Sequence, residues 1–179
     1  ADTAMAYDPS RQSLVLFGGT NDQPTGIRTY GFSDTWEWQS ATRQWTQLHP
    51  ASSPGKLYLH GMVTDVKRAK VLLFGGNASH FVWEWDDAQM NWTNRTPTPA
   101  SVAPDLYHWS AGWDASTALT FDEGLQKMFF FGSEAIWIGA TSNSVFWLWD
   151  PVTAGWVFRD SGDVVDFGTS PSGDTFPPF

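Results

Sequence analysis

The sequence predicts an all-β chain built from three copies of one four-stranded antiparallel unit. A phenylalanine followed by two small residues recurs at intervals of 57 residues, and an aspartate lies nine residues before each copy. A Trp-x-Trp pair follows each phenylalanine, and a further tryptophan lies seven residues after the pair. The repeated residues are Asp8, Phe17, Trp36, Trp38 and Trp45, then Asp65, Phe74, Trp83, Trp85 and Trp92, then Asp122, Phe131, Trp147, Trp149 and Trp156.

Each unit is expected to contain four strands, because short runs rich in Val, Phe and Trp are bounded by turn-forming residues. In chain order the expected strands are 4–8, 14–18, 35–39 and 44–48, then 59–65, 70–75, 81–86 and 91–94, then 117–122, 127–132, 145–150 and 155–158. No segment has a convincing helical period, so the chain is assigned to the all-β class.

The second and third strands of each unit carry the strongest packing signals. The second strand reads LVLF, VLLF or MFFF, and a strand that is apolar on both sides is expected between two neighbouring sheets. The small pair after it, such as Gly75 and Gly76, allows a positive φ or close backbone contact. Both indoles of a Trp-x-Trp pair share one side of the strand, and we expect them to pack on the next sheet.

This pattern resembles the kelch repeat, whose four-stranded blades assemble into a β-propeller. The glycine pairs, the Trp-x-Trp pairs and the final tryptophans carry the resemblance, and Ser133 departs from it where a second glycine is expected. The resemblance covers about residues 4–160 and implies three blades at about 4–50, 58–97 and 117–160, followed by an extended arm at 161–179. Kelch proteins include enzymes, lectin-like modules and protein-binding scaffolds, so the fold does not decide the function.

The composition narrows the possible partners and compartments. With 10 Lys and Arg against 19 Asp and Glu, the net charge of −9 opposes binding to nucleic acid. No apolar run approaches the length of about 18 residues needed for a membrane span. The acidic, lysine-poor and tryptophan-rich chain has no cysteine, which favours a bacterial secreted or periplasmic protein.

The sequence offers little support for catalysis or for a cofactor. The absence of cysteine excludes disulfides, thiolate metal sites and cysteine nucleophiles. It also excludes the thioether-linked copper radical of the galactose oxidases, which are kelch enzymes. The four histidines lack metal-ligand spacing, and no hydrolase, phosphate-binding or metalloprotease motif is present. We therefore predict no metal, no cofactor and no enzymatic activity.

Three blades are too few for a closed ring, since propellers usually have about four to eight. We expect a protein partner, or further copies of the chain in a homo-oligomer, to complete the propeller. The remaining alternatives are that the chain is a piece of a longer polypeptide or that a larger complex covers its open side.

Loop lengths indicate which side of the blades carries function. The connection between the second and third strands is long in the first unit, at 20–34, and in the third, at 133–144. The connection from one unit to the next also lengthens, from 49–58 to 96–116. Both kinds of connection leave a meander on the same side, and variable loops on a rigid scaffold often carry function. The predicted binding residues are Trp109, Trp113, Trp137, Tyr30, Tyr107, His108, His60 and Arg28.

Two functions remain open at this point. The first is a non-catalytic extracellular scaffold that binds protein or carbohydrate through the loop side, although the loop tryptophans could instead cover the core. The alternative is a fragment or half-ring of a carbohydrate-active kelch enzyme such as a sugar epimerase, with active groups Arg28, His60, His108 and Glu134. Glu134 could form an acid and base pair with Asp22 or Asp34, or all three could be solvated surface carboxylates.

Overall fold

The computed structural model describes residues 1–21, 31–76, 81–97, 118–136, 141–159, 168–169 and 175–176; side chains at 132–136, 141–146, 157–159 and beyond are not described. All regular elements within these ranges are β-strands. In the described residues there is no helix long and apolar enough to cross a membrane.

The strands form three four-stranded antiparallel sheets, here called blades, in which each strand pairs with its neighbours in chain order. Blade 1 consists of β1 (Ala4–Asp8), β2 (Ser13–Phe17), β3 (Thr35–Gln39) and β4 (Gln44–Leu48). Blade 2 consists of β5 (His60–Asp65), β6 (Lys70–Gly75), β7 (Val82–Asp86) and β8 (Asn91–Asn94). Blade 3 consists of β9 (Ala118–Asp122), β10 (Lys127–Ile136), β11 (Thr141–Asp150) and β12 (Gly155–Arg159). A separate two-stranded sheet pairs β13 (Gly168–Thr169) with β14 (Thr175–Phe176).

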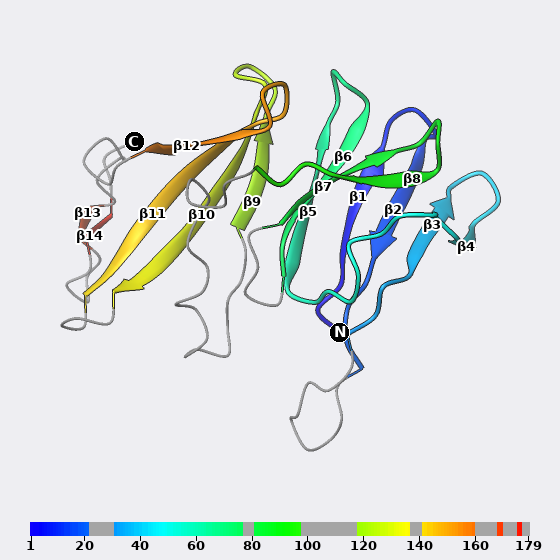
Figure 1. Cartoon of the computed structure of the whole chain (residues 1–179), viewed down its shortest axis with the longest axis horizontal. Helices are drawn as coiled ribbons and strands as arrows, with labels where there is room; N and C mark the ends of the chain where they lie inside the picture. Colours follow the sequence, from blue (N-terminus) through cyan, green and yellow to red (C-terminus); the bar gives the residue numbers. More distant parts are fainter. Residues whose placement is uncertain are drawn as a thin grey trace.

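The three blades follow one another as in part of a propeller, from the blue strands of blade 1 to the yellow and orange strands of blade 3 (Figure 1). Their first strands are neighbours, because β5 contacts both β1 and β9. Blade 2 is therefore sandwiched between blades 1 and 3. The predicted fold class, an all-β partial propeller of three four-stranded antiparallel blades, is confirmed.

One predicted loop is wrong. The segment 133–144 was expected to be a long connection, whereas β10 continues to Ile136 and β11 begins at Thr141, and these two residues are paired. The ladder supplies hydrogen-bond partners to backbone groups that a loop would leave to water. Residues 133–136 and 141–144 are therefore part of a long β10–β11 ribbon.

Two hydrophobic clusters hold the blades together, one at each junction. Between blades 1 and 2, Val15 and Phe17 of β2 pack with Trp85 and Trp92 of blade 2. Between blades 2 and 3, equivalent residues of β6 pack with Trp149 and its neighbours. The tryptophans therefore pack on the preceding blade, which corrects the expectation that they pack on the next one.

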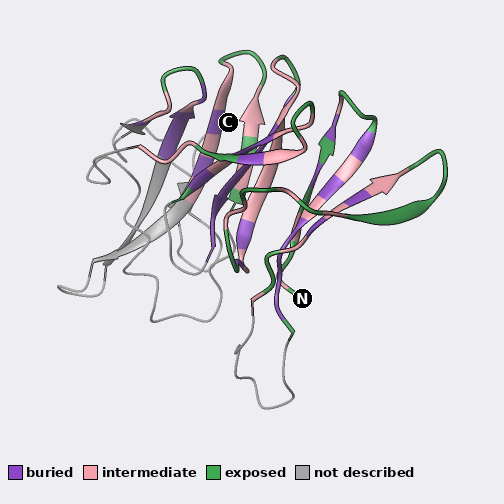
Figure 2. Cartoon of the chain, turned by 45° about the vertical axis from the view of Figure 1, so that its right-hand side comes forward, coloured by how far each residue is buried: buried purple, intermediate pink, exposed green. Residues whose placement is uncertain are grey.

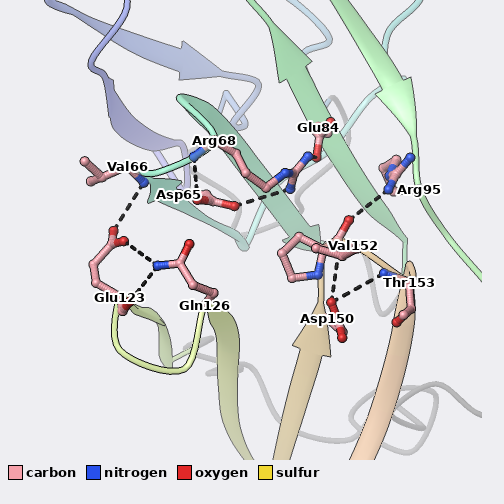
Figure 3. Close-up of polar contacts among 11 residues, drawn as sticks. Asp65, Val66, Arg68, Glu84, Arg95, Glu123, Gln126, Asp150, Val152 and Thr153 are labelled. Atoms are coloured by element: carbon pink, nitrogen blue, oxygen red, sulfur yellow. Dashed lines mark hydrogen bonds and ion pairs between the residues drawn. The ribbon is translucent and has the colours of Figure 1, made fainter.

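Polar contacts supplement both junctions. The Trp92 indole Nε1 donates to Thr35 Oγ1 at 3.0 Å between blades 1 and 2. Between blades 2 and 3, Val66 N donates to Glu123 Oε1 at 3.2 Å and Arg95 Nη2 donates to the Pro151 carbonyl at 2.9 Å (Figure 3). Because these bonds join positions far apart in sequence, they fix how each blade sits against the next.

The glycine pairs after the second strands need the backbone freedom that the sequence predicted. Gly75 has a φ of 78° and Gly18 has a φ of 56°. A Cβ on Gly18 would lie 2.5 Å from the carbonyl oxygen of Leu57, in the linker that leads to blade 2. The glycine therefore permits both the left-handed turn and the close approach of the linker.

Replacing Gly18 by alanine is expected to lower the free energy of unfolding by about 3 kcal/mol, since strain from positive φ adds to a steric clash. The matched control is Gly55, which also has a positive φ of 85° but would place a Cβ in open space, with no neighbouring atom within 4 Å. Gly55→Ala should cost about 1 kcal/mol. Urea unfolding measures both, and equal losses would contradict the clash.

Equivalent tryptophans should contribute differently to the free energy of unfolding, according to whether a preceding blade covers them. Trp92 is 1% exposed, whereas its blade 1 counterpart Trp45 is 42% exposed. Trp92→Ala is expected to cost about 3 to 5 kcal/mol of unfolding free energy as a core truncation. Trp45→Ala should cost less than half as much in the isolated chain. Thermal or urea unfolding of both variants checks this contrast.

Candidate functional site

An open groove of about 850 Å³ lies beside blade 1, where the connections of the first unit meet. Its walls come from the segment before β3, from the end of β4 and from the linker to blade 2. The described residues that line it are Asn21, Gly31, Phe32, Ser33, Asp34, Gln47, Leu48, His49, Pro50, Ser53 and Lys56.

Backbone pairing outside the blades holds the groove walls in place. Isolated β-bridges join Thr20 to Gly31 and Phe32 to Leu57. Phe32 N donates to the Gly19 carbonyl at 2.8 Å, and Leu57 N donates to the Phe32 carbonyl at 3.0 Å. The segment before β3 is thus held between the end of β2 and the linker, so the groove is built on fixed backbone.

Asp34 provides the principal charged acceptor of the groove. Its Oδ2 accepts a hydrogen bond of 2.5 Å from the indole Nε1 of Trp36, which orients the carboxylate. Its Oδ1 is buried and has no hydrogen-bond partner among the described residues. An acceptor in this situation gains from any donor that reaches it, because an unsatisfied buried oxygen is costly.

The other groove residues complement this carboxylate. Phe32 is 44% exposed and offers an aromatic surface. Gln47, His49 and Ser53 supply amide, imidazole and hydroxyl groups, which can both donate and accept hydrogen bonds. In the part of the chain that the structure describes, no group of three or more His, Cys, Asp or Glu residues could hold a metal ion. The described lining residues offer hydrogen bonding and aromatic contact.

Most of the predicted binding residues lie outside the described ranges. These are Trp109, Trp113, Trp137, Tyr30, Tyr107, His108 and Arg28, and Asp22 and His80 also lie there. Glu134 pairs with Asn143 in the β10–β11 ribbon, and only its backbone is described. Of the carboxylates considered for an acid and base pair, only Asp34 has a described side chain, and it lines the groove. The predicted roles of the other residues stay predictions.

His60 is the one predicted binding residue whose side chain is described. It begins β5, is 6% exposed and packs edge-on against Phe17 with 5.7 Å between ring centroids. Neither ring nitrogen makes a hydrogen bond of good geometry. Burial lowers the pKa of His60 from 6.5 to about 4, and the Phe17 carbonyl offsets this only in part. In this structure His60 belongs to the blade 1 and blade 2 junction.

The residues that form the groove were mostly absent from the predicted set. Phe32, Gln47 and Lys56 carry no motif, and their meeting depends on how the linker crosses the end of β4. The signal that could have found them was the loop-length argument, because it pointed to the connections 20–34 and 49–58 that line the groove. The loop lengths thus predicted which surface carries the groove, but not which side chains line it.

A second candidate surface is the side of blade 1 that faces away from blade 2. Strand pairing places its residues in two rows across the four strands. We call this surface the tryptophan face; its apolar members are Met5, Tyr7, Leu14, Leu16, Trp36, Trp38 and Trp45, and Gln47 is its one polar position. Met5 is 49% and Tyr7 46% exposed, and Figure 2 shows the outer strand of blade 1 coloured mostly as exposed.

The tryptophan face also corrects one expectation. Packing of the Trp-x-Trp pairs on another sheet implies that Trp38, Trp85 and Trp149 are all buried. Trp85 and Trp149 are 1% and 0% exposed, which confirms two of the three. Trp38 is only half-buried and packs against Trp45 with 5.4 Å between ring centroids and 50° between the ring planes. The reason is that no described element precedes blade 1 to cover it.

Comparisons with known proteins support the fold. No protein-family model matches the sequence, and no curated protein matches it. Among solved structures, 82 chains are similar. One is a fungal alcohol oxidase of the AA5 family in complex with copper, with a TM-score of 0.52 and 13% identity over 87% of this chain. This chain spans 29% of that structure's length. At this identity the likeness concerns the fold alone.

Acidification should destabilise the chain partly through His60. The His60 imidazole has a pKa near 6.5 in the unfolded chain and a pKa of about 4 in the folded chain. Protonation of His60 therefore does not lower the free energy of unfolding above pH 6.5, and lowers it progressively as the pH falls from 6.5 to 4. Full protonation of His60 lowers the free energy of unfolding by about 3 kcal/mol. His60→Phe removes the titrating group and should give a flatter dependence of unfolding free energy on pH between 6.5 and 4. An unchanged slope would contradict this assignment.

Proposed function

We propose that this protein is a non-catalytic binding and assembly module of kelch type, acting outside the bacterial cytoplasm as a secreted or periplasmic protein. The groove beside blade 1 is the observation that carries the binding part of this proposal. The tryptophan face carries the assembly part, because a large exposed apolar patch is characteristic of an interface. The kelch assignment rests on the repeated glycine, phenylalanine and tryptophan positions.

The groove chemistry favours a carbohydrate ligand. The Asp34 carboxylate can accept hydrogen bonds from sugar hydroxyls, and the Gln47 amide can both donate to and accept from them. An exposed ring such as Phe32 can pack on the apolar side of a sugar. The volume of about 850 Å³ is within the range of small-molecule sites. A neutral mono- or disaccharide unit of a larger glycan fits this combination.

A second candidate function is that the chain forms part of a carbohydrate-active kelch enzyme such as a sugar epimerase. It is favoured by the structural likeness to an alcohol oxidase of which this chain spans only 29%. Its proposed groups are Arg28, His60, His108 and Glu134, and burial of His60 in the blade junction weighs against them. Incorporation of solvent deuterium into a sugar incubated with the protein would favour the enzyme.

Binding is tested by titrating the full chain with a panel of neutral mono- and disaccharides in a calorimeter. We expect at least one sugar to bind and Asp34→Asn to weaken its affinity at least tenfold, because a charge-assisted hydrogen bond contributes about 1.5 to 3 kcal/mol. Asp87→Asn makes the same chemical change in the β7–β8 turn and should leave affinity unchanged. Binding by no sugar, or equal binding by Asp34→Asn, would reject the groove as a glycan site.

A further inference from the structure

Asp8, the last residue of β1, carries a buried carboxylate with one oxygen left unpaired. The residue is 1% exposed. Its Oδ1 accepts hydrogen bonds from the backbone N–H groups of Ser10 at 3.0 Å and Arg11 at 3.3 Å. Its Oδ2 is buried and has no hydrogen-bond partner among the described residues. Ionisation of Asp8 is therefore costly, because a charged oxygen is kept from water without a donor in its place.

The internal repeat shows how the equivalent carboxylate is paired in blade 2. Asp65 corresponds to Asp8, and its Oδ2 accepts a hydrogen bond from Arg68 Nη1 at 3.3 Å (Figure 3). The equivalent of Arg68 in blade 1 is Arg11. Arg11 directs its Nε and Nη2 to the two carboxylate oxygens of Glu37, at 2.5 and 3.0 Å. The guanidinium that would pair with Asp8 is thus held by another acid.

A second carboxylate faces Asp8 from blade 2. Asp87 lies in the β7–β8 turn, and Met90 of the same turn packs against the cluster between blades 1 and 2. The Asp87 side chain makes no ion pair with a described residue, and its negative charge acts on Asp8 across the junction. The equivalent residue of blade 3 is Pro151, which carries no charge. Two unpaired acids therefore meet at this junction, whereas the junction of blades 2 and 3 has no acid at the corresponding turn position.

The charged groups around Asp8 come from three elements. They are Arg11 of the β1–β2 turn, Glu37 of β3 and Asp87 of the β7–β8 turn, and of these only Arg11 is positive. Burial raises the pKa of Asp8 above its ordinary value of 3.8, and the charge of Asp87 raises it further. The backbone N–H of Arg11 and its guanidinium charge offset this only in part.

We propose that Asp8 and Asp87 form a proton-binding pair that makes the junction between blades 1 and 2 more stable as the pH falls. A protonated Asp8 carboxyl carries no charge to repel Asp87. Its O–H can also donate a hydrogen bond, whereas the ionised carboxylate only accepts. The proton comes from solvent and binds at Asp8 Oδ2, the oxygen that lacks a partner among the described residues. This inference is independent of the proposed glycan binding.

Asp8 and His60 respond to pH with opposite signs. The folded chain holds the Asp8 proton more tightly than the unfolded chain does, because the pKa of Asp8 is raised on folding. The free energy of unfolding therefore increases as the pH falls through the folded-state pKa of Asp8, and the increase is complete below 3.8. Protonation of His60, which lies at the same junction, has the reverse effect.

The test follows Asp8 directly in the full chain, by ¹³C NMR of its carboxyl carbon from acidic to neutral pH. We expect the pKa of Asp8 to lie above 3.8 and to fall in Asp87→Asn, because this substitution removes the negative charge that faces Asp8. Asp86→Asn is the matched control. It removes a charge from the same turn, but one that is paired with Lys70 at 3.1 Å, and it should leave the pKa of Asp8 unchanged.

Urea unfolding over the same pH range measures the effect on stability. Asp8→Asn keeps an acceptor for the backbone of Ser10 and Arg11 but binds no proton. Its urea midpoint should therefore shift upward, relative to that of the natural chain, as the pH increases. A pKa of Asp8 at or below 3.8 overturns the proposal. So does a pKa that Asp87→Asn leaves unchanged, because burial then accounts for it without a pair. A midpoint difference that is the same at every pH overturns it as well.

Discussion

The structure depends on one contact, the packing of a tryptophan-bearing sheet side on the aliphatic and phenylalanine side of the blade before it. Val15 and Phe17 receive Trp85 and Trp92, and the equivalent residues of blade 2 receive the tryptophans of blade 3. No single blade can bury both of its sides, because a four-stranded sheet has apolar residues on each. Each blade therefore requires a neighbouring sheet on both sides. The order of the blades follows because the tryptophan-bearing side of one blade packs on the opposite side of the blade before it.

The same contact explains why equivalent residues of the blades differ in exposure. Blade 2 has a neighbour on both sides and buries all four apolar residues of its second strand. Among the described residues, blade 1 has a neighbouring blade on one side only, and its tryptophan face is partly exposed. The proposed assembly role and the local packing rule thus rest on the same physical effect, since burial of apolar area is the main favourable term in association as in folding.

The groove arises from the same architecture by a different route. The linker from blade 1 to blade 2 must cross the ends of β2 and β4, and Gly18 lets it pass close to the backbone. The bridge between Phe32 and Leu57 then holds the segment before β3 against the linker. Trp36 donates to Asp34, so a residue of the tryptophan face orients the charged group of the groove. Blade packing and the candidate binding site are therefore connected through β3.

The sequence alone determined the fold class, the number of blades, and the positions of nearly all twelve blade strands, because period-two patterns and repeated turn residues act over short distances. It also predicted the positive φ of Gly75 and the burial of Trp85 and Trp149. Only the tertiary structure decided that tryptophans pack on the preceding blade, that residues 133–136 and 141–144 are strand, and that Asp34, Gln47 and Ser53 line one groove. These features depend on contacts between segments far apart in the chain, and a local pattern carries no information about which distant surface it will meet.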